Sequence, residues 1–215
     1  MHIVITGASR GIGAALRAHY LAQGHQVTGT SRAGGDDLLA LDVTDPAAHT
    51  RLAAALGNRP VDLLICNAGI YADKGQSLDT GYPAPLWAET FATNVTGVFL
   101  SVQALLPHLA QASQPRIAII SSQMASDTRA PGGSYIYRAS KAAALNLGRN
   151  LSADLAPRGI AVGIYHPGWV QTDMGGATAE ITVDQSAEGL IARFAALSLD
   201  TTGCFETWDG RAHPY

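Results

Sequence analysis

The sequence has little charge and almost no cysteine. Only 14% of its 215 residues are charged and the formal net charge is −3, so there is no basic stripe of the kind that nucleic acid requires. The two cysteines, Cys66 and Cys204, lie far apart and outside any Cys/His spacing, which argues against a disulfide framework and a metal site. No apolar run approaches the roughly 18 to 20 residues that span a bilayer. We therefore expect neither nucleic acid nor membrane as partner, and interpret both cysteines as packing residues.

The sequence also lacks internal repeats, low-complexity segments and linkers rich in proline or serine. At 47% hydrophobic, it can bury a substantial core, and its length suits one compact domain over residues 1–215. The opening stretch "MHIVITGAS" has neither a basic leader nor a cleavage site, so it is interpreted as a strand and not a signal peptide. The cytoplasm is the expected compartment.

What the sequence does contain is an alternation of short β-branched runs with longer segments rich in Ala and Leu. This alternation predicts βαβ units in a parallel sheet covered by helices on both faces, with ligands at the carboxyl ends of the strands. Residues 71–87 and 168–189 have the least pattern, and the first of these is expected to be a loop before a helix. The strand-like runs are "HIVIT" at 2–6, "QVTGT" at 26–30, "VDLLICN" at 61–67, "RIAIISS" at 116–122 and "IAVGIYHP" at 160–167.

A glycine turn follows the first of these strands. Gly7, Gly11 and Gly13 lie between the strand and an amphipathic helix, with the spacing G-x-x-x-G-x-G in place of the common G-x-G-x-x-G. Free backbone N–H groups at a helix N-terminus, with no Cβ in the way, are what a pyrophosphate needs. Glycine also occurs in plain tight turns, but its place at the first βα junction favours a dinucleotide.

The second predicted strand ends in "VTGTSRAGG", without the acidic residue that would accept hydrogen bonds from an adenosine ribose. Arg32, with Arg10 from the glycine turn, could clamp a 2′-phosphate, so NADP(H) is favoured over NAD(H). The alternative is two solvated surface arginines. Too few residues remain before "LALDVTD" for a crossover helix, so we expect a turn there, with Asp42 and Val43 near the adenine.

Tyr137 and Lys141 are i and i+4 in a predicted helix, whereas Tyr135 has Ala139 at that position. Tyr137 is therefore the candidate acid–base, and Tyr135 a pocket or packing residue. Proton transfer near neutral pH would need the tyrosine pKa to fall by about three units, which a neighbouring cation and an oxidised nicotinamide could supply. Upstream, Ser121 and Ser122 end a strand, where a hydroxyl could hold a substrate carbonyl or merely satisfy the backbone.

Seven motifs in one order carry a resemblance that covers essentially the whole chain. They are "TGASRGIG" at 6–13, "LDVTD" at 41–45, "CNAG" at 66–69, "TNVTG" at 93–97, "IISS" at 119–122, "YRASK" at 137–141 and "HPGWVQTDM" at 166–174. With them, the chain resembles the short-chain dehydrogenase/reductase family. The combination of "SSQMAS", "GGSYIYRASKAA" and "HPGWVQTDMGG", with "ETWDGRAHPY" at the end, resembles its C-factor-like, carbonyl-reductase-like branch. The resemblance implies a single-domain, Rossmann-like, doubly wound α/β fold with a mostly parallel sheet of about seven strands and helices on both faces.

The resemblance also implies roles for individual residues. Tyr137 would be the general acid/base, Lys141 would lower its pKa and hold the nicotinamide ribose, and Ser122 would orient the carbonyl. Asn94 would hold a water in a proton relay, or else bond nearby backbone as a helix-interior polar residue. The implied cofactor-binding residues are Gly7, Ser9, Arg10, Gly11, Ile12, Gly13, Arg32, Asp42, Val43, Asn67, Ala68, Gly69, Tyr137, Lys141, Pro167, Gly168, Val170 and Thr172.

The sequence departs from the family pattern at two places. Ser122 lies fifteen residues before Tyr137, whereas the family's usual spacing is thirteen, so Ser121, Ser122 and Ser126 all remain candidates for the catalytic serine. The segment after Thr172, where the family usually has a substrate lid, is short, which suggests an open site.

The expected reaction is reversible hydride transfer between NADP(H) and a small-molecule carbonyl/alcohol pair. The alternatives are a cofactor-binding regulatory or signalling protein on the same fold, and an epimerase or lyase. The resemblance further implies a homodimer or homotetramer built on the helices that carry Asn94 and Tyr137.

Overall fold

The strands of the computed structural model form one parallel sheet, in the order β3-β2-β1-β4-β5-β6-β7. The model describes residues 1–35, 37–79 and 81–215. All six strand pairs are parallel, and the carboxyl ends of the strands therefore share one edge. The strands are β1 (His2–Ile5), β2 (Gln26–Ser31), β3 (Leu38–Ala40), β4 (Leu63–Cys66), β5 (Arg116–Ile120), β6 (Ala161–His166) and β7 (Phe205–Thr207).

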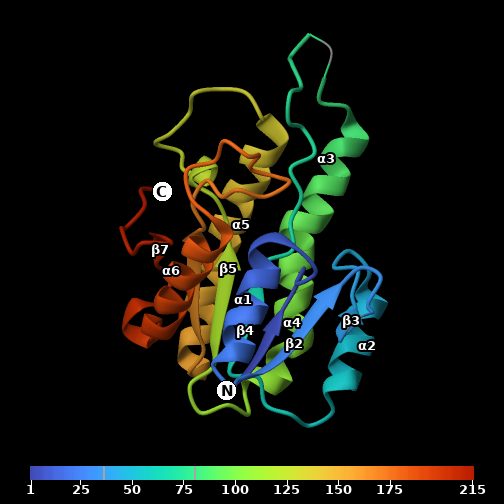
Figure 1. The fold of residues 1–215 in the computed structure, drawn as a ribbon, viewed down its shortest axis with the longest axis vertical. Coiled ribbons are helices and arrows are strands. Elements are labelled where there is room, and N and C mark those ends of the chain that lie inside the picture. Colours follow the sequence, from blue (N-terminus) through green and yellow to red (C-terminus); the bar gives the residue numbers. More distant parts are fainter. Residues whose placement is uncertain (36, 80) are drawn as a thin grey trace.

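Helices cover both faces of this sheet (Figure 1). α3 and α4 run on from one another through the π-helical turn η1, and the 3₁₀ turns η2 (Gln123–Ala125), η3 (Ala156–Arg158) and η4 (Leu199–Thr201) flank α5 and β7. The helices are α1 (Gly11–Ala22), α2 (Pro46–Leu56), α3 (Ala84–Phe91), η1 (Ala92–Thr96), α4 (Gly97–Leu109), α5 (Tyr135–Leu155) and α6 (Val183–Ala196).

The core consists of two layers, one on each face of the sheet. Alternate residues of each strand point into opposite layers. In β1, Val4 packs with α2, α4 and α5 on one face, while Ile3 and Ile5 pack with α1 and α6 on the other. Because side chains alternate along a strand and helices cover both sides, every residue of β1, β4 and β6 is buried. This explains why these strands are continuous apolar runs in the sequence.

The chain crosses the sheet at its centre, which fixes where a ligand can bind. From β1 the order continues through β2 to β3 on one side and restarts at β4 on the other. In such sheets the crevice lies outside the carboxyl ends of the strands at this switch point. In Figure 1 the segments before α3 and before α5 both extend beyond that edge, at the top of the view.

The predicted doubly wound sheet and its seven strands are confirmed. Between β2 and β3 the described residues form turns and no helix, as the short spacing predicted. The segment predicted as a loop at 71–87 is shorter than expected, because α3 begins at Ala84 with Pro85 in its first turn, where proline is well tolerated. The three-residue strand β7 was not assigned from the sequence.

Candidate active site

A cleft of about 590 Å³ lies along the carboxyl ends of the central strands. Its wall combines the glycine turn, the ends of β2 and β4, two residues of α5 and the segment after β6. Most of the predicted cofactor residues line it: Gly7, Ser9, Arg10, Gly11, Ile12, Arg32, Asp42, Val43, Asn67, Ala68, Gly69, Tyr137, Lys141, Pro167 and Thr172.

Three predicted cofactor residues that the structure describes lie outside the cleft wall. Gly13 is inside α1, where an added Cβ would stand 2.2 Å from the carbonyl oxygen of Gly7, so it allows the helix to approach the turn. Gly168 lines a second cavity, and Val170 is buried beside its bridge partner Ile181. These three residues shape the backbone around the cleft, and their role in binding the cofactor stays a prediction.

The glycine turn has the geometry that a pyrophosphate requires. Gly7 and Gly11 have φ angles of +69° and +54°, which glycine adopts without strain. Asn67 Nδ2 donates to the carbonyl oxygens of Thr6 and Gly7, at 3.0 and 2.9 Å, and so fixes the turn. Among the described residues no side chain caps α1 and no acid lies in its first turn, so its N–H groups face the cleft free. The residues present therefore fit a dinucleotide.

The two arginines predicted to clamp a 2′-phosphate both line the cleft. Arg10 Nη1 donates to Asp173 Oδ2 at 2.7 Å, and this ion pair joins the glycine turn to the segment after β6. Arg32 lies beside Asp42, whose carboxylate it stabilises by charge. The Arg32 guanidinium thus lies near the ends of β2 and β3, while that of Arg10 is held toward the segment after β6.

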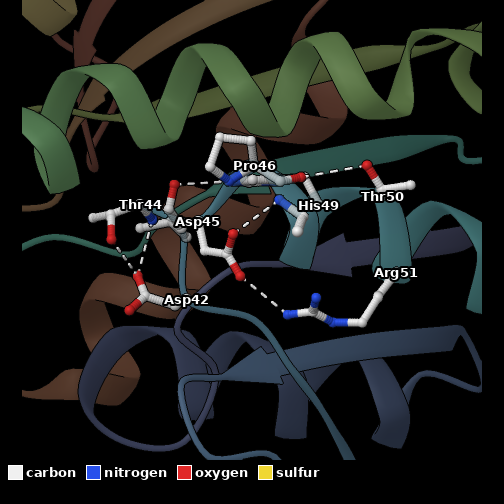
Figure 2. A network of polar contacts seen from close by, with 9 residues as sticks. Asp42, Thr44, Asp45, Pro46, His49, Thr50 and Arg51 are labelled. Carbon is white, nitrogen blue, oxygen red and sulfur yellow. Dashed lines mark hydrogen bonds and ion pairs between the residues drawn. The ribbon is translucent and has the colours of Figure 1, made fainter.

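Hydrogen bonds hold the expected adenine side of the cleft in place (Figure 2). The Asp42 carboxylate accepts from Thr44 N at 2.9 Å and Thr44 Oγ1 at 2.7 Å, and these bonds hold its pKa below its ordinary value. Asp45 caps α2 by accepting from Ala47 N at 2.9 Å. His49 Nε2 hydrogen-bonds the carbonyl oxygen of Val43 at 3.0 Å. A residue of α2 thus holds Val43 in place.

Tyr137 and Lys141 lie on one face of α5, as predicted, and both are buried, with 7% and 5% exposure. Lys141 Nζ donates to the carbonyl oxygen of Ile120 at 3.0 Å and lies 5.6 Å from the centre of the Tyr137 ring. Tyr135 is 38% exposed and packs edge-on against Tyr82, in keeping with its interpretation as a packing residue.

The structure separates the three candidate serines. Ser122 Oγ accepts from Met124 N at 3.1 Å and its hydroxyl hydrogen-bonds Tyr137. Ser121 Oγ donates to the carbonyl oxygen of Lys141 at 3.0 Å, and Ser126 Oγ donates to that of Tyr215 at 3.1 Å. Ser122 is therefore the serine beside the phenol.

Burial raises the pKa of Tyr137 above its ordinary value, and the hydrogen bond from Ser122 opposes this only in part. Tyr71 and Asp73 raise the tyrosine pKa further, while burial lowers the pKa of Lys141 to about 8. Burial thus dominates the pKa of Tyr137 in this structure, and the lowering of that pKa by Lys141 together with an oxidised nicotinamide stays a prediction. The phenol is protonated at neutral pH.

Asn94 is in the π-helical turn η1, which interrupts the run from α3 to α4. Its Oδ1 accepts from Ile70 N at 2.8 Å, and its Nδ2 donates to Ile70 O at 2.9 Å and Ser140 Oγ at 3.0 Å. A Cβ on Gly69 would meet both Asn94 Oδ1 and Lys141 Nζ, so these two side chains converge there. Asn94 is thus bonded to nearby backbone, as one interpretation held, and also connects the segment after β4 to α5.

Three residues near Tyr137 were not predicted from the sequence, namely Tyr71, Asp73 and Ser134. The Tyr71 ring stacks on that of Tyr137 with centres 4.3 Å apart, and its hydroxyl hydrogen-bonds Ser134 Oγ at 2.5 Å. Asp73, 1% exposed, accepts from Ile136 N at 2.9 Å and Tyr137 N at 3.2 Å. Tyr71 and Asp73 come from the least patterned part of the sequence, and no local signal connects them with α5.

Comparison with known proteins identifies the family. The model of the family described as short chain dehydrogenase matches residues 1–181. The chain belongs to the short-chain dehydrogenase family. It is 38% identical over 157 residues to C-signal of Myxococcus xanthus, covering 73% of this chain and 93% of that protein. It is 33% identical over 210 residues to the 3-oxoacyl-(acyl-carrier-protein) reductase FabG of Escherichia coli, covering 90% and 81%.

Solved structures of this family are similar over the whole chain. The NADPH-bound carbonyl reductase from chicken fatty liver has a TM-score of 0.89 at 31% identity, covering 100% of this chain and 98% of that one. These findings confirm the resemblance to the short-chain dehydrogenases and to their carbonyl-reductase-like branch. Within the described residues, no helix has the length and apolar character that crossing a membrane requires.

Proposed function

We propose that this short-chain dehydrogenase is an NADP(H)-dependent carbonyl reductase that acts on small-molecule carbonyl compounds. One observation carries the proposal: a buried phenol, hydrogen-bonded by Ser122, lies on the wall of the cleft next to a buried lysine. A phenol that is protonated at neutral pH can give a proton to a carbonyl oxygen as that oxygen gains charge.

Several features of the cleft support NADP(H) as the cofactor. The glycine turn and the free N-terminus of α1 suit the pyrophosphate, and β2 ends at Ser31 without an acid. Arg10 and Arg32 would hold the 2′-phosphate by charge-assisted hydrogen bonds, Arg10 in exchange for its contact with Asp173. The similar carbonyl reductase from chicken fatty liver is itself NADPH-bound.

The roles of the side chains follow from their positions. When bound, NADPH supplies the hydride for the carbonyl carbon. Tyr137 protonates the carbonyl oxygen, and Ser122 holds that oxygen by a hydrogen bond. The ammonium group of Lys141 stabilises the phenolate that remains. Asn94, bonded to Ile70 and Ser140, holds a water through which the phenolate recovers its proton.

The raised pKa of Tyr137 favours one direction of the reaction. Reduction requires the protonated phenol, which is the form present at neutral pH. Alcohol oxidation requires the phenolate, which burial disfavours. We therefore expect carbonyl reduction to be faster than alcohol oxidation near pH 7.

The test is NADPH oxidation with a panel of aldehydes, ketones, diketones and quinones, in the wild type, Tyr137→Phe and Tyr135→Phe. Tyr137→Phe should lower turnover by about 10²- to 10⁴-fold, the usual contribution of a general acid, and keep NADPH affinity. Tyr135→Phe makes the same chemical change two residues away on the same helix and should retain activity. Undiminished turnover in Tyr137→Phe would refute the role of the tyrosine. Tight NADPH binding with no carbonyl reduced would instead favour a regulatory protein.

A further inference from the structure

A second cavity, of about 380 Å³, lies at the carboxyl ends of β6 and β7. It adjoins the cleft along the chain at two places. Pro167 lines the cleft while its neighbours His166 and Gly168 line the second cavity, and Ser121 lines the cleft while Gln123 lines the second cavity. Ser122 lies between Ser121 and Gln123 in the chain, so the serine beside the Tyr137 phenol belongs to the connection between the two walls.

The wall of the second cavity carries two guanidinium groups and two indoles. Arg129 comes from the loop before α5, and its Nη1 donates to Gln123 Oε1 at 2.5 Å. Arg211 comes from the segment after β7 and pairs with Asp209 at 2.9 Å while remaining largely exposed. The two indoles, of Trp169 and Trp208, provide flat apolar surface on the same wall. Among the described residues of the wall, Glu180 is the one carboxylate.

His166 lies on the wall of the second cavity and has a buried ring nitrogen without a hydrogen-bond partner among the described residues. The side chain is 8% exposed, its Nδ1 is buried without a partner, and no bond joins either ring nitrogen to a described residue. Burial lowers the pKa of His166 to about 4, and His213, Arg129 and Arg211 act in the same direction against a smaller opposite effect of Asp209. The ring is thus neutral at pH 7, and Arg129 and Arg211 favour that form. Buried polar groups without partners are rare in proteins and require an explanation.

We propose that the second cavity binds the carboxylate of an elongated carbonyl substrate, whose reacting carbonyl lies between Ser122 and Tyr137. This inference rests on the proposed reductase function and specifies its substrate class as oxo-carboxylates with an apolar or aromatic spacer. Arginine suits the group because its planar fork matches a carboxylate. The spacer packs on the indole rings of Trp169 and Trp208.

The first experiment compares 4-carboxybenzaldehyde with its methyl ester, which has the same ring and aldehyde but no charge. The wild type should prefer the carboxylate in kcat/KM. Arg129→Gln and Arg211→Gln should each reduce that preference about tenfold, as expected for the loss of about 1.4 kcal/mol at a partly open site. Arg129→Lys, which keeps the charge, should restore part of it. Glu180→Gln should increase it, because a like charge is removed.

Arg158→Gln is the matched control, since it removes an exposed arginine in η3. It should leave the preference unchanged. The mutated arginines and Glu180 are exposed, so each variant should fold, and its melting temperature verifies this. Equal reduction of acid and ester, unaffected by Arg129→Gln and Arg211→Gln, would overturn the inference and leave the reductase function standing.

The second experiment does not depend on turnover. Two of the three tryptophans line the cavity, so titration with 4-methylbenzoate should quench tryptophan fluorescence saturably in the wild type. The Kd obtained from this titration should rise about tenfold in Arg129→Gln, the change that about 1.4 kcal/mol produces. If no carbonyl is reduced but 4-methylbenzoate binds in this way, the reductase proposal fails. The second cavity would then be an anion-binding site without a role in substrate recognition. Absence of binding would overturn the site itself.

Discussion

Asp73 connects the segment before α3 with the N-terminus of α5, and substitutions of Asp73 test what this connection does. α5 begins in an unusual way, because Ser134 at its N-cap position has a φ of +49° and no described side chain next to it in sequence caps the helix. The orphan N–H groups of Ile136 and Tyr137 are bonded instead by Asp73, which lies 63 residues before Ile136. Asp73→Asn removes the charge and replaces one acceptor oxygen by a donor, at nearly constant volume.

The size of the effect follows from these contacts. Loss of an N-cap costs about 0.5 to 2 kcal/mol, and a hydrogen bond to a charged group contributes about 1.5 to 3 kcal/mol. The site is fully buried, so water cannot replace the lost acceptor. We expect Asp73→Asn to lower the free energy of unfolding by about 2 kcal/mol, and Asp73→Ala by about 3 kcal/mol because both N–H groups lose their partner.

A purely structural cap would change stability alone, so the pKa of Tyr137 is the decisive measurement. The charge of Asp73 raises that pKa, and its removal should therefore lower it. NMR of protein labelled with ¹³C at tyrosine Cζ reports the titration, with Tyr137→Phe to assign the signal. Asp45→Asn, which removes the carboxylate cap of α2, is the control and should affect stability only. An unchanged Tyr137 titration in Asp73→Asn would refute the reasoning.

Other predictions concern the lysine, the arginines and the glycine turn. Lys141→Met should abolish activity and raise the free energy of unfolding at pH 7 by about 1 to 2 kcal/mol. Burial lowers the pKa of Lys141 from 10.5 to about 8, so burying the ammonium group costs about 3 kcal/mol of stability, and the hydrogen bond to Ile120 offsets part of this cost. The gain in stability is full below about pH 8 and vanishes as the pH rises to 10.5. Thermal unfolding of the wild type and the variant at pH 7 and pH 10 checks this. Arg32→Ala should raise the KM for NADPH about tenfold and leave that for NADH unchanged, as kinetics with both cofactors would show. Gly13→Ala places a Cβ 2.2 Å from a backbone oxygen, so NADPH binding, measured by fluorescence, should be lost together with several degrees of melting temperature.

Local patterns in the sequence were enough to predict the strands and the relation between Tyr137 and Lys141. β1, β4 and β6 are buried on both faces, so their hydrophobic runs are uninterrupted, and the i, i+4 pair depends on helix geometry alone. β7 escaped assignment because it is a three-residue edge strand, too short for a period. The sequence was therefore most informative where the structure depends on neighbours along the chain.

The electrostatics of the site could not be predicted in the same way. The pKa of Tyr137 depends on how completely the ring is covered, and the cover includes Tyr71, more than 60 residues away. The sequence indicated a cation four residues along the helix, which would lower the pKa. It could not indicate that burial outweighs this effect and that burial also brings the pKa of Lys141 down to about 8.

The choice among the three serines shows how distant contacts resolve a local ambiguity. The carbonyl oxygen of Tyr215 accepts from Ser126 Oγ, Thr128 Oγ1 and Thr128 N, and these bonds hold the first half of the loop before α5. At the other end, Arg138 Nε donates to the carbonyl oxygen of Gly133 at 3.1 Å. Between these two ends the exposed stretch reaches Gly132 and Gly133, whose positive φ angles suit glycine. The longer spacing therefore leaves Ser122 beside Tyr137, and the same loop carries Arg129 to the second cavity.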